Sequence, residues 1–362
     1  METIKESSSS RIKTVVRARP LSSFEASRNP KIVTQINAAE SLLLLKDPEN
    51  FTKTPESFAF DACYDDKTSQ KAFYEDSCQK LVKSVIAGNN ANIVTYGQSA
   101  SGKTHTIIGP SYQPAPEDEG VLYRACDDLL ENLDSKVATL QYSMLDLYQD
   151  EIDDLLSTSK EGKYSLVEQP DKSVVVKDAT WLTITSGEEF RKIVTKAFAK
   201  RDPGNVMNAR SYSAHSICKF LLTRIDPASG DKTTSMLSIF DLAGLEKLSP
   251  VADPKSTSVK GAVQTNQGLF AFRKVVSSLA NKEKVTPYRD SKLTRLLKNF
   301  FVSSNSLLIV TVAQSEVYYK DTLGTLRLTQ SFREIVVPTK TLKTEKMTEE
   351  KPEGKQEIGV FE

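Results

Sequence analysis

The segment at 97–104 reads GQSASGKT, which fits the GxxxxGK(S/T) pattern of a phosphate-binding loop. It directly follows the apolar run NIVTY and precedes a predicted helix start. Glycines let such a loop wrap so that its backbone N–H groups and the helix N-terminus face a phosphate. Lys103 would reach the β- and γ-phosphates, and Thr104 would ligate Mg²⁺. A Gly- and Ser-rich loop that matches by chance is the alternative, and the preceding strand pattern disfavours it.

An acidic residue further along the chain is a candidate for holding the metal. Asp241 ends the strand-like run MLSIF, and a phosphate-binding loop needs an acidic residue at the end of a neighbouring strand to hold magnesium through water. The next residues are Leu-Ala-Gly, which makes the N–H of Gly244 a candidate sensor of a γ-phosphate. Taken alone, Asp241 is also an ordinary strand-ending acid. Together with the loop, it favours a magnesium–nucleotide site.

The elements that must position these residues alternate between short apolar runs and amphipathic helical patterns, which is typical of an α/β layer architecture. No Pro/Gly/Ser-rich linker interrupts the middle of the chain, and there is no internal repeat. We therefore predict one domain over 11–337, between a disordered tail at 1–10 and a flexible segment at 338–362. Strands are predicted at 12–17, 92–96, 138–148, 217–225, 236–241 and 307–313, and helices at 68–87, 121–133, 187–199, 269–279, 291–301 and 323–335.

Composition excludes several classes of protein. The 362 residues include 48 Lys plus Arg and 47 Asp plus Glu, and this near-neutral balance argues against a protein whose whole surface binds a polyanion, unless the positive charge is concentrated in one place. Nucleic acid is not an expected partner. No run approaches the roughly 18 apolar residues of a membrane helix, and METIKESSSSR lacks the apolar core of a signal peptide, so a cytosolic chain without membrane insertion is expected. The four cysteines form no CxxC pair and the two histidines add no familiar zinc spacing, which disfavours metalloenzyme and disulfide-scaffold interpretations.

The positive charge is nevertheless concentrated in one segment. Residues 255–298 hold ten basic and two acidic side chains, so this segment carries +8 and the rest of the chain −7. Such segregation suggests a surface that meets a polyanion, because steering follows the local field rather than the total charge. Solvated helix faces are the alternative explanation.

Four motifs in order resemble those of kinesin motor domains. GQSASGKTHT is similar to the family's GQTGSGKTxT, and DLAGLE at 241–246 is similar to DLAGSE in its second switch segment. YRDSKLTR at 288–295 is a family motif, and RARP at 17–20 fits the family's RxRP element. The resemblance covers 11–337. It implies a P-loop NTPase fold of the α/β class, with a central β-sheet flanked by helices on both faces.

The resemblance also implies ATP and Mg²⁺ as the bound nucleotide and metal. The RxRP element would border the adenine, and Tyr74 would stack on it, although Tyr74 also suits half-buried helix packing and Arg19 a surface salt bridge. Thr104 and Asp241 would hold the metal. The implied nucleotide-binding residues are Arg17, Arg19, Pro20, Tyr74, Gly97, Gln98, Ser99, Ala100, Ser101, Gly102, Lys103, Thr104 and His105.

The first switch segment, 208–215, departs from the family. The family's NxxSSRSH reads NARSYSAH here, which keeps Asn208, Ser211 and His215. Tyr212 replaces a serine that contacts the magnesium and γ-phosphate region, Ser213 replaces the arginine, and Ala214 replaces the next serine.

The lost arginine pairs in kinesins with the glutamate that is Glu246 here, and this pair closes the site over the attacking water. Ser213 cannot make that pair, Leu245 replaces a further family serine, and Arg210 is an alternative partner without a defined geometry. We expect nucleotide binding to persist while hydrolysis is slow or lost; the alternative is compensation elsewhere. The implied catalytic set is Asn208, Ser211, Gly244 and Glu246.

In kinesins, the stretch that corresponds to 255–298 rests on acidic tubulin, so the resemblance implies microtubules as the partner and a cytoplasmic, cytoskeletal location. One departure is that the family's NxxKSL ends here as NQGL at 266–269, with its lysine replaced and Gly268 inside a predicted helix. The segment at 338–362 stands where a neck linker would, and cargo or dimerisation partners would bind through regions absent from this chain. The candidate microtubule contacts are Lys260, Lys282, Lys284, Arg289, Lys292 and Arg295.

Two functional interpretations therefore remain open. One is a microtubule-stimulated ATPase that works as a motor, which the phosphate-binding loop favours. The other is a microtubule-attachment module, nucleotide-responsive or nucleotide-independent, which the altered first switch segment favours. A small-molecule kinase or signalling GTPase is disfavoured, because the RxRP element is kinesin-like and no NKxD-type guanine motif is present.

Overall fold

A mixed β-sheet forms the centre of the molecule. The structure is a computed structural model that describes residues 10–159, 164–170, 173–201, 214–244 and 257–337, without the side chains of 10 and 257–266. Within these ranges nine strands form the sheet in the order β12-β8-β13-β14-β7-β15-β2-β6, with β9 paired to β8. The strands are β2 Lys13–Ala18, β6 Ala62–Tyr64, β7 Ala91–Tyr96, β8 Ala138–Tyr148, β9 Glu151–Asp154, β12 Leu182–Thr183, β13 His215–Ile225, β14 Lys232–Asp241 and β15 Ser306–Val312.

The parallel strands matter most for the site. β14, β7, β15, β2 and β6 run parallel to one another, whereas β8 and β13 join antiparallel. Ligands of parallel α/β sheets bind beyond the carboxyl ends of the strands. Tyr96 and Asp241 stand at such ends on adjacent strands.

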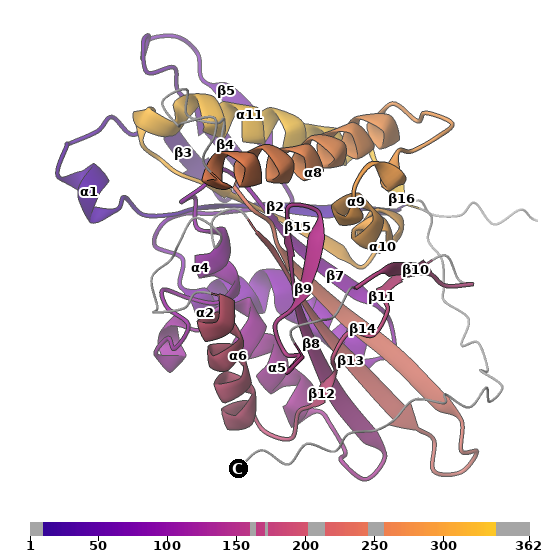
Figure 1. Cartoon of the computed structure of the whole chain (residues 1–362). Helices are drawn as coiled ribbons and strands as arrows, with labels where there is room; N and C mark the ends of the chain where they lie inside the picture. The colour runs from indigo at the N-terminus through magenta and orange to yellow at the C-terminus, as the bar shows by residue number, and fades with distance from the viewer. Residues whose placement is uncertain (1–9, 160–163, 171–172, 202–213, 245–256, 338–362) are drawn as a thin grey trace, which may run out of the picture.

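Helices cover both faces of the sheet, as predicted (Figure 1). One face buries apolar side chains of α2 Gln70–Phe73, α3 Gln79–Ile86, α5 Val121–Glu131 and α6 Gly187–Arg201. The other face is covered by α8 Thr257–Ala280, α9 Lys292–Leu296, α10 Lys298–Val302 and α11 Tyr319–Gln330. Each helix presents an apolar stripe to the sheet, which is how an amphipathic period of 3.6 residues is buried.

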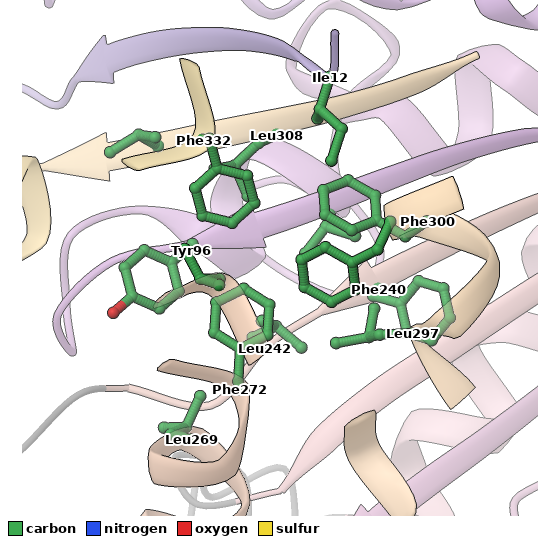
Figure 2. Close-up of a cluster of buried hydrophobic side chains, with 14 of the residues drawn as sticks. Ile12, Tyr96, Phe240, Leu242, Leu269, Phe272, Leu297, Phe300, Leu308 and Phe332 are labelled. Carbon is green, nitrogen blue, oxygen red and sulfur yellow. The ribbon is translucent and has the colours of Figure 1, made fainter. Parts of the chain in front are cut away.

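Aromatic side chains anchor α8 to the sheet. Phe272 is fully buried among Phe301, Phe332 and Tyr96, with its ring centroid 5.4 Å from that of Tyr96 (Figure 2). Tyr96 is the last residue of β7 and is followed by the phosphate-binding loop. The helix of the basic segment is therefore packed directly against the strand that carries the loop.

Most of the predicted strands and helices are present, with shifted ends. The helix predicted over 68–87 is interrupted by a π-helical turn at Tyr74–Cys78, and the one over 291–301 is split into α9 and α10. Sequence patterns missed the strands of two to four residues, because so few positions show no period. Three of these, β6, β9 and β12, belong to the central sheet. The others are β1 Ser10–Arg11, β3 Thr34–Asn37, β4 Leu42–Leu45, β5 Glu56–Ala59, β10 Leu166–Glu168, β11 Val174–Val176 and β16 Val336–Val337, and the short helix α1 Ser23–Ala26 was missed as well.

The two described ends of the domain pair with each other. Ser10 lies opposite Val337 in the antiparallel β1–β16 ribbon, so the boundary predicted after residue 10 falls inside a strand. The remaining residues of both predicted tails lie outside the described ranges. Among the described helices, none combines the length and the apolar character needed to cross a membrane.

Candidate nucleotide site

Two glycines explain how the phosphate-binding loop turns between β7 and α4 Lys103–Ile107. A Cβ on Gly97 would lie 2.3 Å from the Thr311 carbonyl oxygen on β15, so only glycine fits there. Gly102 has φ +102°, in the left-handed region that glycine adopts without steric cost. The two glycines of the motif are therefore explained by the close approach of Gly97 to β15 and by the left-handed backbone of Gly102.

Lys103 is buried under the loop. Its ammonium group donates to the carbonyl oxygens of Gly97, at 2.9 Å, and Gln98, at 2.8 Å. Ser101 ties the loop to β15 through a 2.6 Å hydroxyl contact with Thr311. These bonds keep the lysine at the base of the loop, within the segment where a phosphate is expected.

The two predicted metal ligands lie in contact. The Thr104 hydroxyl donates to Oδ2 of Asp241 at 2.6 Å, and the Thr95 hydroxyl donates to Oδ1 at 2.9 Å. Asp241 and Thr95 are register partners on β14 and β7, which explains the contact. A hydroxyl beside a carboxylate suits Mg²⁺, which prefers hard oxygen ligands and retains several waters. The residues present therefore fit the metal that the fold family implies.

His215 joins the end of the first switch segment to the start of the second. The Ala243 N–H donates to His215 Nδ1 at 3.0 Å. His215 is 2% exposed, and its burial, with the nearby charges of Lys103 and Arg201, lowers the pKa of the imidazole to about 3. The ring is therefore neutral, and Nδ1 is the accepting nitrogen.

The remaining positions of the two switch segments are not all described. Gly244 is described and buried. Asn208, Ser211 and Glu246, together with the altered positions Tyr212, Ser213 and Leu245, lie outside the described residues. Their predicted roles therefore stay predictions.

The RxRP element lines a small cavity of about 30 Å³ next to the loop. Arg17 is buried, and its guanidinium group donates to Gln70 Oε1 at 2.6 Å and lies 4.7 Å from the Phe73 ring centroid. Burial lowers the pKa of Arg17 to about 10, so it remains charged at neutral pH. The cavity is lined by Arg17, Ala18, Arg19, Pro20, Asp65, Asp66, Thr68, Ser101, Gly102, His105, Thr106 and Thr311.

The structure places Tyr74 in the hydrophobic core, away from the predicted nucleotide contacts. Its side chain is 3% exposed, belongs to the core on the α5 side of the sheet, and donates its hydroxyl to Asp128 Oδ2 at 2.6 Å. It does not line the cavity beside the RxRP element. A ring enclosed by core side chains cannot stack on a base, so the packing alternative holds for this residue.

Sequence reasoning missed several supporting residues. Thr95 orients Asp241, Thr311 braces the loop, and Thr322 accepts a 3.1 Å bond from the Gln98 amide. None of these belongs to a recognisable motif. Thr95 and Asp241 are connected by the register of the parallel strands β7 and β14. This register is known only once the strands are paired in the folded sheet.

The predicted microtubule contacts differ in their surroundings. Lys282, Lys284 and Arg289 are exposed. Lys292 is instead paired with Glu151 at 3.1 Å and is partly buried, and Arg295 donates to the Leu166 carbonyl oxygen at 3.4 Å. The side chain of Lys260 lies outside the described part of the chain. Carboxylates from β9 and β10 thus neutralise part of the basic segment, since Glu168 also pairs with Lys298 at 2.6 Å.

The loop, the strand-end carboxylate and the parallel strands that join them define an α/β protein of the P-loop class. The kinesin motor domain family matches residues 17–335, most of the domain. The chain therefore belongs to the kinesin motor domain family.

Individual relatives agree with this membership. The chain is 30% identical over 335 residues to the kinesin-1 heavy chain of Homo sapiens, covering 90% of this chain and 33% of that protein. It is 34% identical over 285 residues to kinesin-like protein 5 of Schizosaccharomyces pombe, covering 75% and 32%. The solved structure of a fast kinesin has a TM-score of 0.83 and 26% identity, covering 92% of this chain and 95% of that one. The chain spans about a third of the length of these two curated relatives.

Proposed function

We propose that this chain is a motor domain that binds ATP with Mg²⁺ at the P-loop and a microtubule through its basic segment, with slow hydrolysis. The observation that carries the nucleotide site is the 2.6 Å contact between Thr104 and Asp241 beside the buried Lys103. This arrangement supplies a hydroxyl, a carboxylate and a cation within one loop and one strand end. Those are the groups that hold a magnesium-bound triphosphate.

Each group has a distinct part in the proposed binding. Lys103 would exchange its bonds to the Gly97 and Gln98 carbonyls for bonds to phosphate oxygens. Thr104 would ligate the metal, and Asp241 would hold one of its waters. Bound magnesium supplies positive charge that offsets the developing negative charge in phosphoryl transfer. The RxRP strip would border the base.

Slow hydrolysis is inferred from the sequence of the first switch segment. Tyr212 and Ser213 stand where kinesins have a serine and an arginine, so Glu246 lacks its usual partner. Losing transition-state closure costs orders of magnitude in phosphoryl transfer. Steady-state ATP turnover, measured with and without microtubules, tests this inference. Robust polymer-stimulated turnover by the unmodified chain would refute it.

A reversal experiment tests the assigned cause. The double change Tyr212→Ser with Ser213→Arg should raise turnover, because it returns both the hydroxyl and the cation that would pair with Glu246. The matched control, Tyr212→Ser with Ser213→Ala, returns the hydroxyl without the cation and should recover less. Equal turnover of the two variants would show that the missing arginine is not limiting.

A second candidate function is a microtubule-attachment module without ATP-driven motility, in the cytoplasm and on the cytoskeleton. The altered first switch segment favours it. Co-sedimentation with microtubules in ATP, in ADP and without nucleotide separates a nucleotide-responsive module from an independent one. Directed single-molecule movement would instead establish the motor.

A further inference from the structure

One guanidinium group connects the start of the chain to the phosphate-binding loop. Arg19 follows β2, and its Nε donates to the carbonyl oxygen of Ala100 inside the loop. Its Nη1 donates to Oε2 of Glu25 at 2.6 Å and to the Pro20 carbonyl oxygen at 2.7 Å. The side chain of Arg19 is 17% exposed and that of Glu25 is 5% exposed, so the ion pair between them is partly buried.

The bond reaches the loop at a conformationally costly position. Ala100 has φ +53°, in the left-handed region that a residue with a Cβ seldom adopts unless neighbouring contacts hold it there. The peptide is planar, so holding the Ala100 carbonyl also holds the N–H of Ser101, which donates to the Gln98 carbonyl oxygen at 3.3 Å within the loop. Arg19 therefore holds one peptide inside the phosphate-binding loop.

Glu25 in turn holds Arg19. It lies in α1, is 5% exposed, and its Oε2 also accepts bonds from the Ser22 N–H at 2.8 Å and the Ser22 hydroxyl at 2.6 Å. Burial alone would raise the pKa of the Glu25 carboxyl, but the bonds from Arg19 and Ser22 outweigh it and lower that pKa. The carboxylate is thus ionised at neutral pH and fixed by its own capping box.

We propose that Glu25 is a positioning residue of the nucleotide site, which acts through Arg19 to hold the Ala100 peptide and with it the phosphate-binding loop. The proposal rests on the proposed ATP site and assigns Arg19 to the phosphate cradle as well as to the base. No sequence motif pointed to Glu25. Its role is visible only in the contacts that run from α1 through Arg19 to the loop.

Two ligands separate a role at the phosphates from a role at the base. Binding of Mg-ATP and of magnesium tripolyphosphate, which has no base, is measured by calorimetry for the full chain and for Glu25→Gln. A loop-positioning role predicts that both affinities fall by a similar factor, about tenfold, since a charge-assisted bond is lost. Loss of ATP affinity alone, or of neither, would overturn the proposal. Glu40→Gln, an exposed glutamate bonded locally to Asn37, is the matched control and should change neither affinity.

A second variant keeps the test valid if Glu25→Gln folds poorly. Arg19→Lys keeps a cation beside Glu25 but removes the planar Nε donor to Ala100, so it should also weaken tripolyphosphate binding. Unchanged tripolyphosphate binding in this variant would contradict the proposal.

A rescue experiment distinguishes loop positioning from general stabilisation of α1. Adding Ala100→Gly to Glu25→Gln should raise the affinity for magnesium tripolyphosphate about threefold or more above that of Glu25→Gln alone. Glycine adopts the left-handed φ without support, so the loop no longer needs the bond from Arg19. Failure to recover would show that Glu25 does not act through Ala100. If the unmodified chain binds neither ligand, the proposed nucleotide site itself is wrong, whereas binding that Glu25→Gln leaves intact refutes only the positioning role.

Discussion

His215 is the residue at which the two switch segments meet in the described structure, and its neutral state has a consequence for stability. Its pKa of about 3 lies below the ordinary value of 6.5, so the unfolded chain takes up this proton first as the pH falls. The free energy of unfolding should therefore decrease below pH 6.5, by about 2 kcal/mol at pH 5 from this group alone.

Urea unfolding at pH 7.5 and pH 5 measures this effect. Other groups titrate over the same interval, so the comparison is with His215→Asn, which has no proton to take up and keeps an oxygen for the Ala243 N–H. The variant should lose about 2 kcal/mol less than the unmodified chain between the two pH values. Equal losses would mean that His215 is not held neutral.

Thr104 is a residue-scale test of the metal site. Thr104→Ala removes the hydroxyl that now contacts Asp241 at 2.6 Å. We expect affinity for Mg-ATP to fall roughly tenfold or more, with little change in magnesium-free binding, because only the metal loses a ligand. Titrations with and without magnesium measure both. Thr104→Ser keeps the hydroxyl and is the control; equal losses in magnesium and in its absence would contradict the assignment.

At the scale of elements, helix α8 links the basic segment to the P-loop through packing. Phe272 on α8 contacts Tyr96 at the end of β7, and a Cβ at Gly268 would lie 3.9 Å from His215 Nε2. The same helix therefore packs against the strand before the loop and passes close to the histidine that joins the switch segments. A shift of α8 on a partner surface would reach the nucleotide site by these contacts.

Two helical glycines give a prediction about stability. A Cβ at Gly268 meets its nearest atom, Leu293 Cδ2, at 3.7 Å, an ordinary contact, and one at Gly324 in α11 meets nothing within 4 Å. Gly268→Ala and Gly324→Ala should each raise the free energy of unfolding by about 0.5–1 kcal/mol, since glycine is costly inside a helix. Urea denaturation checks both.

Gly97→Ala is the opposing control, because its Cβ would lie 2.3 Å from the Thr311 carbonyl oxygen. This variant should be destabilised. If Gly268→Ala were also destabilised while Gly324→Ala gained stability, the packing of α8 against Leu293 would be tighter than the structure indicates.

At the scale of the whole molecule, a net charge of +1 conceals a segment of +8. Its exposed cations include Lys284 and Arg289, which are available to an acidic partner, whereas Lys292 is paired with Glu151. Lys284→Ala and Arg289→Ala should each weaken microtubule binding by about two- to fivefold and reduce its dependence on salt. Lys292→Ala should have a smaller effect.

Co-sedimentation with microtubules over a range of ionic strength measures these affinities. Lys67→Ala, an exposed lysine far along the sequence from the basic segment, is a matched control for loss of one charge. Binding that does not respond to salt would refute the electrostatic account, and a large loss for Lys292→Ala alone would show that its pair with Glu151 opens on the partner.

The sequence by itself determined the fold class, the family, the loop at 97–104 and the basic segment, and it predicted Thr104 and Asp241 as metal ligands. It could do so because these features depend on adjacent residues or on a regular period along the chain. Tertiary structure alone decided that Tyr74 packs in the core and that Glu151 neutralises Lys292. It also revealed the contact of Glu25 with Arg19 beside the loop. Each of these depends on which distant segments approach one another, and no local pattern encodes an approach that the folded sheet and its helices create.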